Sequence, residues 1–184
     1  MNYMKIVPCD MANGPGVRVS LFVSGCDHHC PGCHNPQTWN PNAGQPFTED
    51  TLDELIELLR PDYIQGLTLT GGDPLYPENR ETIFHIIGKV VENFGNSKDI
   101  WTWTGYTWEE LQSESPVLKN DELHWILSLI DVLVDGPYIE SKRDISLPYM
   151  GSSNQRVIDC WKSKPVEPVL WWIPGEKKEV NYGR

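Results

Sequence analysis

Short strand-like stretches alternate with helix-like stretches along most of the chain, and this alternation constrains the fold more than any other feature. Apolar residues recur at every second position in the first stretch, and the others are short, apolar and followed by Gly or Pro. The predicted strands are residues 17–23, 66–70, 99–104 and 131–135. The predicted helices are residues 51–60, residues 78–94, a short helix from Thr107, and a helix marked by Leu123, Ile126, Leu127 and Ile130. Strands that alternate with helices pair in parallel through right-handed crossovers. The sequence therefore predicts an α/β fold with parallel strands.

The number of strand–helix units limits the architecture. Four or five units are too few for a closed eight-stranded barrel, which needs about 250 residues. A partial, open barrel or a curved α/β sheet remains, and in both the functional site lies at the carboxyl ends of the strands. Residues of unusual chemistry follow all four predicted strands, at Cys26–Cys33, Gly71–Pro74, Thr104–Tyr106 and Asp135–Tyr138. These four loops predict one site on one rim.

Capping residues indicate where the helices begin and end. Thr51 and Glu54 predict a capping box at the start of the first helix, and Thr107 with Glu110 predicts another at the short helix. Gly95 predicts the end of the long second helix.

The last part of the chain differs in composition from the rest. Residues 161–184 contain three prolines, the pair Trp171-Trp172 and a run of charged residues. We therefore divide the chain into one domain, residues 1–160, and a C-terminal extension or strap, residues 161–184. The two tryptophans predict that part of this extension packs on the domain or on a partner.

The charge balance excludes two classes of partner. The chain has 15 Lys and Arg against 26 Asp and Glu, a formal net charge of −11. Binding to nucleic acid or to anionic lipid requires clustered positive charge, so we expect neither as a partner. No apolar run approaches the ~18–20 residues of a transmembrane helix. No apolar stretch follows Lys5 as in a signal peptide, and we expect a cytoplasmic protein.

Three of the five cysteines, Cys26, Cys30 and Cys33, have the spacing Cys-x3-Cys-x2-Cys. Such closely spaced cysteines in a reducing compartment favour metal ligation over disulfides. Thiolates suit zinc or an iron–sulfur cluster, and a cubane held by three cysteines keeps one iron open for chemistry. A structural zinc site remains the alternative on spacing alone. Its fourth ligand would be His28, His29 or His34.

Two of these motifs together resemble the radical S-adenosylmethionine (SAM) superfamily. The cysteine motif follows the first predicted strand, and Gly71-Gly72-Asp73-Pro74 follows the second. The resemblance implies a partial open (βα) barrel of the radical SAM type with parallel strands. It also implies one 4Fe–4S cluster, with Cys26, Cys30 and Cys33 as its ligands, and SAM bound at the open iron.

Further motifs narrow the resemblance to one family, the activating proteins of the anaerobic ribonucleoside-triphosphate reductase. These motifs run in order through residues 1–160 and are Asn13–Arg18, the cysteine loop, His34–Trp39, Leu69–Leu75, Trp103–Tyr106, Val134–Tyr138 and Gly151–Arg156. The resemblance implies an enzyme that takes one electron from an external donor and cleaves SAM to a 5′-deoxyadenosyl radical. That radical installs a glycyl radical on the large subunit of the reductase, which is the implied protein partner.

The resemblance also implies which residues contact SAM. Asp73 can accept charge-assisted hydrogen bonds from the SAM ammonium, although it can equally serve as an acid before the following helix. Glycines permit close backbone approach to a ligand. Asp135 is a candidate for the ribose hydroxyls. The cofactor-binding candidates are Gly32, Cys33, His34, Gly71, Gly72, Asp73, Pro74, Thr104 and Asp135.

Two alternatives stay open at this point. One is the activase of a different glycyl radical enzyme, and the other is a non-catalytic zinc or iron–sulfur module. The module predicts no SAM binding and gives the Gly71–Pro74 turn no purpose. Gly32 departs from the wider superfamily, in which an aromatic residue often precedes the last cysteine, so the adenine contact stays open between His34 and the backbone of Gly32–His34.

Overall fold

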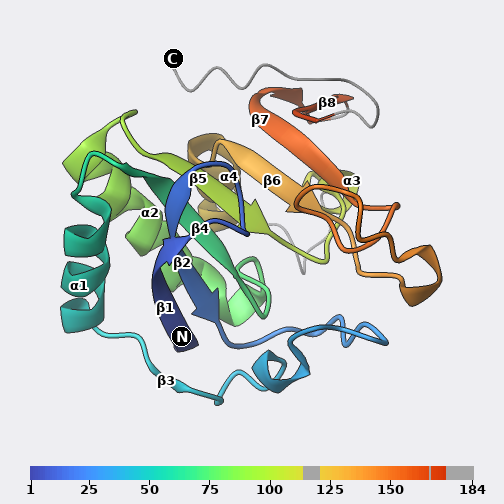
Figure 1. The fold of residues 1–184 in the computed structure, drawn as a ribbon, viewed down its shortest axis with the longest axis horizontal. Coiled ribbons are helices and arrows are strands. Elements are labelled where there is room, and N and C mark those ends of the chain that lie inside the picture. The colour runs from blue at the N-terminus through green and yellow to red at the C-terminus, as the bar shows by residue number, and fades with distance from the viewer. Residues whose placement is uncertain (114–120, 166, 173–184) are drawn as a thin grey trace.

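The computed structural model describes residues 1–113, 121–165 and 167–172, which centre on one eight-stranded sheet (Figure 1). The strands are β1 (Asn2–Asp10), β2 (Val17–Val23), β3 (Gln45–Pro46), β4 (Ile64–Gly71), β5 (Asp99–Trp103), β6 (Val132–Asp135), β7 (Arg156–Lys164) and β8 (Glu167–Leu170). The α-helices are α1 (Glu49–Leu59), α2 (Arg80–Phe94), α3 (Trp108–Leu111) and α4 (Asp121–Leu129), and the 3-10 helices are η1 (Pro36–Thr38), η2 (Pro77–Asn79) and η3 (Glu140–Lys142). The strand order is β3-β1-β2-β4-β5-β6-β7-β8.

The sheet is mixed, and this overturns the predicted fold class. The pairs β2–β4, β4–β5 and β5–β6 are parallel. The other four pairs, β1–β2, β1–β3, β6–β7 and β7–β8, are antiparallel. The prediction of a partial open (βα) barrel of the radical SAM type with parallel strands was therefore wrong. The protein has an open, mixed sheet in which antiparallel pairs outnumber parallel ones.

The strands on either side of the parallel centre explain this error. In β1 only Tyr3 and Asp10 are buried, so the strand lacks the apolar alternation that predicts one. Residues 11–16 alone connect β1 to β2, which is too short for the crossover that a parallel pair requires. β7 is buried in its first half and largely exposed beyond Cys160. Only its first half therefore has the apolar residues that predict a strand.

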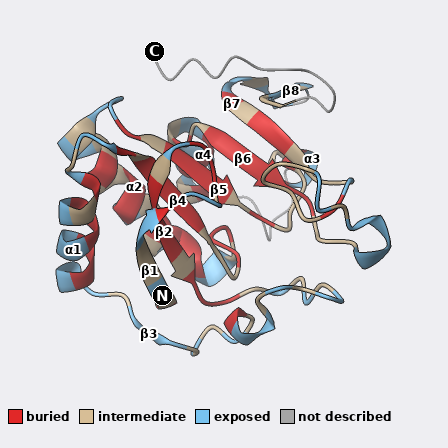
Figure 2. Ribbon diagram, in the orientation of Figure 1, coloured by how far each residue is buried: buried red, intermediate tan, exposed pale blue. Residues whose placement is uncertain are grey.

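The main hydrophobic core lies between one face of the sheet and the helices. Val19, Leu21 and Val23 of β2 are buried on this face, as are Leu67 and Leu69 of β4. Figure 2 shows the central strands buried, while the outer side of α1 is exposed. The helical residues of this core are Leu52, Leu55, Ile56, Leu59, Ile83, Ile86, Ile87, Val90, Trp108, Leu111, Leu123, Ile126 and Leu127.

The individual elements agree with the sequence better than the architecture does. The four predicted strands correspond to β2, β4, β5 and β6, and the predicted helices correspond to α1, η2 with α2, α3 and α4. α2 ends at Gly95, whose φ of 54° is in the left-handed region and whose N–H donates to the carbonyl of Val91. The prediction that this helix ends at Gly95 is therefore confirmed.

The predicted capping box is confirmed at α3, and the one predicted at α1 is wrong. At α3, Thr107 accepts from the backbone of Glu110, and the Glu110 side chain accepts from Thr107, as predicted. At α1 the cap is Thr48, one turn before the predicted start. Its hydroxyl accepts from the N–H of Thr51 at 3.3 Å, and the Thr51 hydroxyl accepts from the N–H of Thr48 at 3.4 Å. The prediction of a box between Thr51 and Glu54 was wrong, because Thr51 is the third residue of the helix rather than its cap.

We expect Thr48→Ala to lower the free energy of unfolding by about 1 kcal/mol, because the N–H of Thr51 at the start of α1 loses its side-chain acceptor. Urea denaturation followed by circular dichroism measures this change. The matched control is Glu54→Ala, at an exposed position of the same helix, which should stay within about 0.5 kcal/mol of the wild type. A larger effect at Glu54 than at Thr48 would restore the sequence-based cap.

A second, smaller core lies on the opposite face of the sheet. Trp101 of β5 is buried there, and the ring of Trp171 meets it edge-on with 4.9 Å between centroids. The N–H of Trp171 donates to the carbonyl of Val157 at 2.7 Å. The ring of Tyr149 also contacts Trp101 edge-on, at 5.1 Å. The segment after β8 therefore packs on the sheet, as the tryptophan pair predicted.

The described part of the C-terminal extension belongs to the sheet. Residues 161–164 continue β7, and residues 167–170 form β8. The charged run at 176–179 lies outside the described residues. Within the described ranges, no helix has the length and apolar character needed to cross a membrane.

Candidate functional site

The loops after β2, β4, β5 and β6 lie next to one another, because these strands are neighbours in the sheet and run in parallel. Their arrowheads point to the same side of the molecule (Figure 1). The four loops are the cysteine loop (residues 24–35), the Gly71–Pro74 turn, Thr104–Tyr106 and Asp135–Tyr138. All sequence-predicted site residues therefore lie on, or begin from, this one rim.

The cysteine loop is anchored at its beginning by η1 and the residue after it. The N–H of Gly25 donates to the carbonyl of Thr38 at 2.8 Å, and the N–H of Cys26 donates to the carbonyl of Trp39 at 3.1 Å. Gly25 has a φ of 97°, a conformation that favours glycine. The chain thus leaves β2, makes the loop and returns beside its own starting point.

The three thiols are free and partly exposed. Burial, followed by the charge of Asp73, raises the pKa of the Cys26 thiol to about 12. Burial also raises the pKa of Cys30. Iron binds the thiolate and not the thiol, so ligation at neutral pH releases protons from these side chains.

The donor set of this loop suits an iron–sulfur cluster. Cys26, Cys30 and Cys33 supply three thiolates from one loop, which are the usual ligands of such clusters. Cys9 and Cys160 lie in β1 and β7, outside the rim loops. In the described parts of the chain, no group of three or more His, Cys, Asp or Glu side chains is arranged around a single metal ion.

The three histidines considered as zinc ligands have other contacts. The Nε2 atom of His28 lies 3.0 Å from an oxygen of Asp73. The ring of His29 packs on Trp39, with 4.8 Å between centroids. The third candidate, His34, lies with its ring 5.8 Å from that of Tyr138. The structure therefore gives no support to a zinc site with a histidine as fourth ligand.

The Gly71–Pro74 turn is fastened to the cysteine loop by its backbone. The N–H of Gly72 donates to the carbonyl of Val23, and the N–H of Asp73 donates to the carbonyl of Gly25, both at 2.8 Å. A Cβ atom on Gly72 would lie 2.6 Å from the Gly25 oxygen, and Gly71 has a φ of 105°. These glycines are required by the close approach of the two loops, a packing reason that operates without any ligand.

Asp73 is the centre of a hydrogen-bond network at this rim. Its side chain is 1% exposed, and Oδ1 accepts from the N–H of Leu75 at 2.8 Å. Oδ2 accepts from the hydroxyl of Thr104 and the N–H of Gly105, both at 2.9 Å, and lies 3.0 Å from Nε2 of His28. Both oxygens of the predicted SAM-ammonium acceptor thus have partners within the protein.

His28 is the member of this network that belongs to the cysteine loop. Burial lowers its pKa, but the hydrogen bond and charge of Asp73, together with Asp27, outweigh burial, and the net shift is upward. Its ring meets the ring of Tyr106 edge-on at 4.4 Å. From the sequence His28 was a candidate only as a zinc ligand, because nothing in a sequence pairs a loop histidine with an acid 45 residues away.

Asp135, the candidate for ribose binding, is also engaged by the protein. It is 1% exposed, and its Oδ2 accepts from the N–H of Trp108 at 2.7 Å, at the start of α3. Arg156 binds both of its oxygens and forms a second bidentate pair with Glu109, at 3.0 and 2.7 Å. These two carboxylates raise the pKa of Arg156. Asp135 therefore links β6 to α3 and β7.

The last part of the cysteine loop lies against the segment after β6. Gly32 has a φ of 77°, and a Cβ atom there would lie 3.0 Å from the carboxylate carbon of Glu140 and 3.2 Å from the ring of Tyr138. Gly32, which departs from the pattern of the resembled superfamily, is favoured by its positive φ, and an added Cβ would press on the exposed end of the Glu140 side chain. No motif of the sequence predicted Glu140 at the rim.

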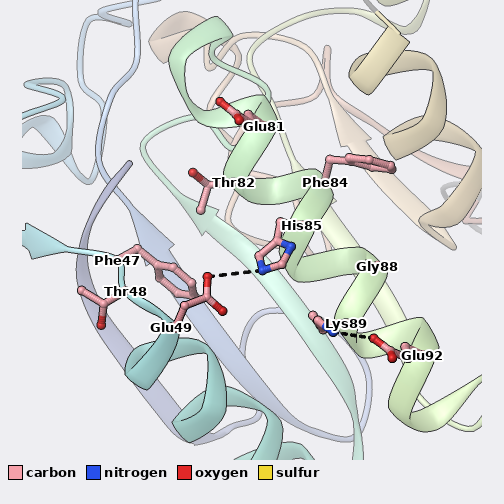
Figure 3. A pocket seen from close by; sticks show the side chains of 10 residues that line it. All are labelled: Phe47, Thr48, Glu49, Glu81, Thr82, Phe84, His85, Gly88, Lys89 and Glu92. Carbon is pink, nitrogen blue, oxygen red and sulfur yellow. Dashed lines mark hydrogen bonds and ion pairs between the residues drawn. The ribbon is translucent and has the colours of Figure 1, made fainter.

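A groove of about 820 Å³ lies on the helical side of the molecule, between the start of α1 and α2 (Figure 3). Phe47 contributes an aromatic wall, while His85 pairs with Glu49 at 3.4 Å and Lys89 pairs with Glu92 at 2.7 Å. None of the residues that line it belongs to the four rim loops. Its lining carries the carboxylates of Glu49, Glu81 and Glu92 against the single lysine Lys89, and we assign it no role.

Known proteins match this chain over most of its length. Residues 12–158 match the family model of the 4Fe-4S single cluster domain. The anaerobic ribonucleoside-triphosphate reductase-activating protein of Enterobacteria phage T4 is 48% identical over 157 residues, which cover 85% of this chain and 93% of the relative. The chain belongs to the family of anaerobic ribonucleoside-triphosphate reductase-activating proteins.

Other members of this activating-protein family are similar to the same extent. The protein of Escherichia coli K12 is 45% identical over 159 residues, which cover 85% of this chain and 97% of the relative. That of Vibrio cholerae is 42% identical over 157 residues, which cover 84% and 96%. The family model contains the whole cysteine loop and the rim, and it ends within β7, before β8.

Proposed function

We propose that this protein is the activating enzyme of the anaerobic ribonucleoside-triphosphate reductase, and that Cys26, Cys30 and Cys33 hold one 4Fe–4S cluster. The observation that carries the proposal is the three-thiol loop on the rim, within a chain that matches the 4Fe-4S single cluster domain and named activating proteins. When bound, the reduced cluster supplies the electron that cleaves SAM to methionine and a 5′-deoxyadenosyl radical, which takes a hydrogen atom from a glycine of the large reductase subunit.

The protein's own part in this chemistry is to hold the cysteine loop in place. The loop is fastened at Gly25 and Cys26 to the carbonyls of Thr38 and Trp39, and by Asp73 to the end of β4. Three thiolates leave one iron of a cubane open, and an open position is what a substrate-binding centre needs. Rigid support of the ligands is the feature that such a site requires.

Residues on the same rim are the proposed contacts for SAM. Since Asp73 and Asp135 have protein partners for their oxygens, we propose that they act by fixing Thr104, Gly105 and the start of α3. The cofactor-binding set stays the one proposed from the sequence, namely Gly32, Cys33, His34, Gly71, Gly72, Asp73, Pro74, Thr104 and Asp135, and Asp73 and Asp135 belong to it by positioning their neighbours.

The proposed partners follow from the same assignment. They are the large subunit of the anaerobic reductase, as protein substrate, and an external electron donor. The formal net charge of −11 supports the exclusion of nucleic acid and anionic membranes as partners. We propose a cytoplasmic location, which the reducing conditions needed by three free thiols support.

Anaerobic reconstitution tests this function. The protein is loaded with iron and sulfide, reduced with dithionite and mixed with SAM, and 5′-deoxyadenosine is quantified. We expect this product, and a glycyl radical signal in electron paramagnetic resonance (EPR) when the reductase is added. Product that never yields a radical on the reductase would favour the activase of another glycyl radical enzyme. Stoichiometric zinc without product would contradict the assignment and favour a zinc module.

A further inference from the structure

His28 connects the cysteine loop to a carboxylate that is itself fixed by two strands. Asp73, at the end of β4, also accepts from the hydroxyl of Thr104 and the N–H of Gly105, which follow β5. Because the carboxylate is 1% exposed and held by these donors, the histidine Nε2 meets an acceptor in a fixed position. The contact is therefore directional and not a loose surface ion pair.

The space around the imidazole is shaped to receive it. A Cβ atom on Gly105 would lie 2.3 to 2.6 Å from three atoms of the His28 ring, so only glycine leaves room beneath it. The ring of Tyr106 covers another side, with centroids 4.4 Å apart. The Tyr106 hydroxyl donates to the carboxylate of Asp27 at 3.1 Å, so two consecutive residues of the loop are tied to the segment after β5.

These two residues lie between the first two cysteines of the motif. Cys26 is fixed by its own N–H, whereas the backbone around Cys30 follows His29, which has a left-handed φ of 46°. A non-glycine residue in that conformation needs support from its surroundings. The His28–Asp73 contact supplies this support, because it fixes the residue directly before His29.

We propose that His28 is a positioning residue, which fixes the Cys26–Cys30 segment through Asp73 so that the thiolates meet a cluster without further rearrangement. This proposal rests on the proposed function only in that the loop holds a cluster. It assigns to His28 a role independent of iron ligation, and it explains why residue 105 must be glycine.

The test compares cluster retention in His28 variants of the full chain. In His28→Ala we expect iron to be lost to a chelator about 10- to 100-fold faster than in the wild type, the range typical of partners that orient metal ligands. His28→Gln can still donate from its amide to Asp73 and should restore retention to within about threefold of the wild type. Gly105→Ala, which fills the space under the ring, should reproduce the loss although it changes no residue of the loop.

The matched control is His29→Asn, because asparagine accepts a left-handed φ and the His29 ring packs on Trp39, not on Asp73. It should lose iron at a rate within about twofold of the wild type. The EPR spectrum of the reduced cluster should broaden in His28→Ala and Gly105→Ala but not in His28→Gln. Equal retention in His28→Ala and the wild type would overturn the proposal, as would loss in His28→Gln equal to that in His28→Ala.

The outcomes separate this proposal from the proposed function. A wild type that binds the cluster but does not cleave SAM would contradict the function and leave the His28 comparison intact. A wild type that binds no cluster would overturn both. Hydrogen exchange of the cysteine loop in the iron-free protein gives an independent readout, and faster exchange is expected in His28→Ala but not in His28→Gln.

Discussion

Replacing any one of Cys26, Cys30 and Cys33 by alanine should abolish stable cluster binding and, with it, SAM cleavage. The loop offers three thiols, and the other two cysteines lie in β1 and β7, so the described structure provides no further thiol at the rim. With two thiolates left, a cubane has two irons without protein ligands. Iron and sulfide content after anaerobic reconstitution, together with the visible absorption of the cluster, measures this loss.

The fold should survive these substitutions, which separates loss of the cluster from loss of the protein. All three cysteines are partly exposed and lie outside both hydrophobic cores, so each change should alter the free energy of unfolding of the iron-free protein by less than about 1 kcal/mol. Cys9→Ala, at an exposed position of β1, is the control and should bind the cluster normally. A triple-alanine variant that still cleaves SAM would refute the proposed function.

The centre of the sheet could be predicted because its strands are buried and uniform. In β2, Val19, Leu21 and Val23 face the helices, and this alternation is visible in the sequence. β1 could not be predicted in the same way, since most of its residues are half-buried or exposed and it contains Pro8. An edge region that depends on pairing rather than on burial leaves little trace in the pattern of apolar residues. The wrong fold class follows from this difference.

The position of the site was predictable, but its internal contacts were not. Loops after parallel strands meet at one rim whatever the identity of their residues, so the cysteine loop and the Gly71–Pro74 turn could be placed together. The partner of Asp73 is a histidine 45 residues earlier, and the partner of Asp135 is Arg156 across an antiparallel pair that the sequence did not reveal. Both carboxylates were therefore interpreted as ligand contacts, while the structure gives each a partner of its own.

Arg156→Leu should be the most destabilising change at the rim that leaves the cysteine loop intact. Asp135 is 1% exposed, and among the described residues Arg156 is the cationic side chain that pairs with it. Removing one member of a buried ion pair leaves an uncompensated buried charge. We therefore expect the free energy of unfolding to fall by about 3 kcal/mol. This value is at the lower end of the usual range because Arg156 is partly exposed. Urea denaturation of the iron-free protein measures it.

A second substitution distinguishes this buried charge from lost packing. Asp135→Asn keeps an oxygen for the N–H of Trp108 but removes the charge, so adding it to Arg156→Leu should recover about 1 kcal/mol or more. Lys162→Met is the control, because its pair with Asp159 is exposed on the lysine side and should contribute less than about 1 kcal/mol. If the double variant is no more stable than Arg156→Leu alone, the instability comes from packing of the arginine stem, and Asp135 would be free to bind a ligand.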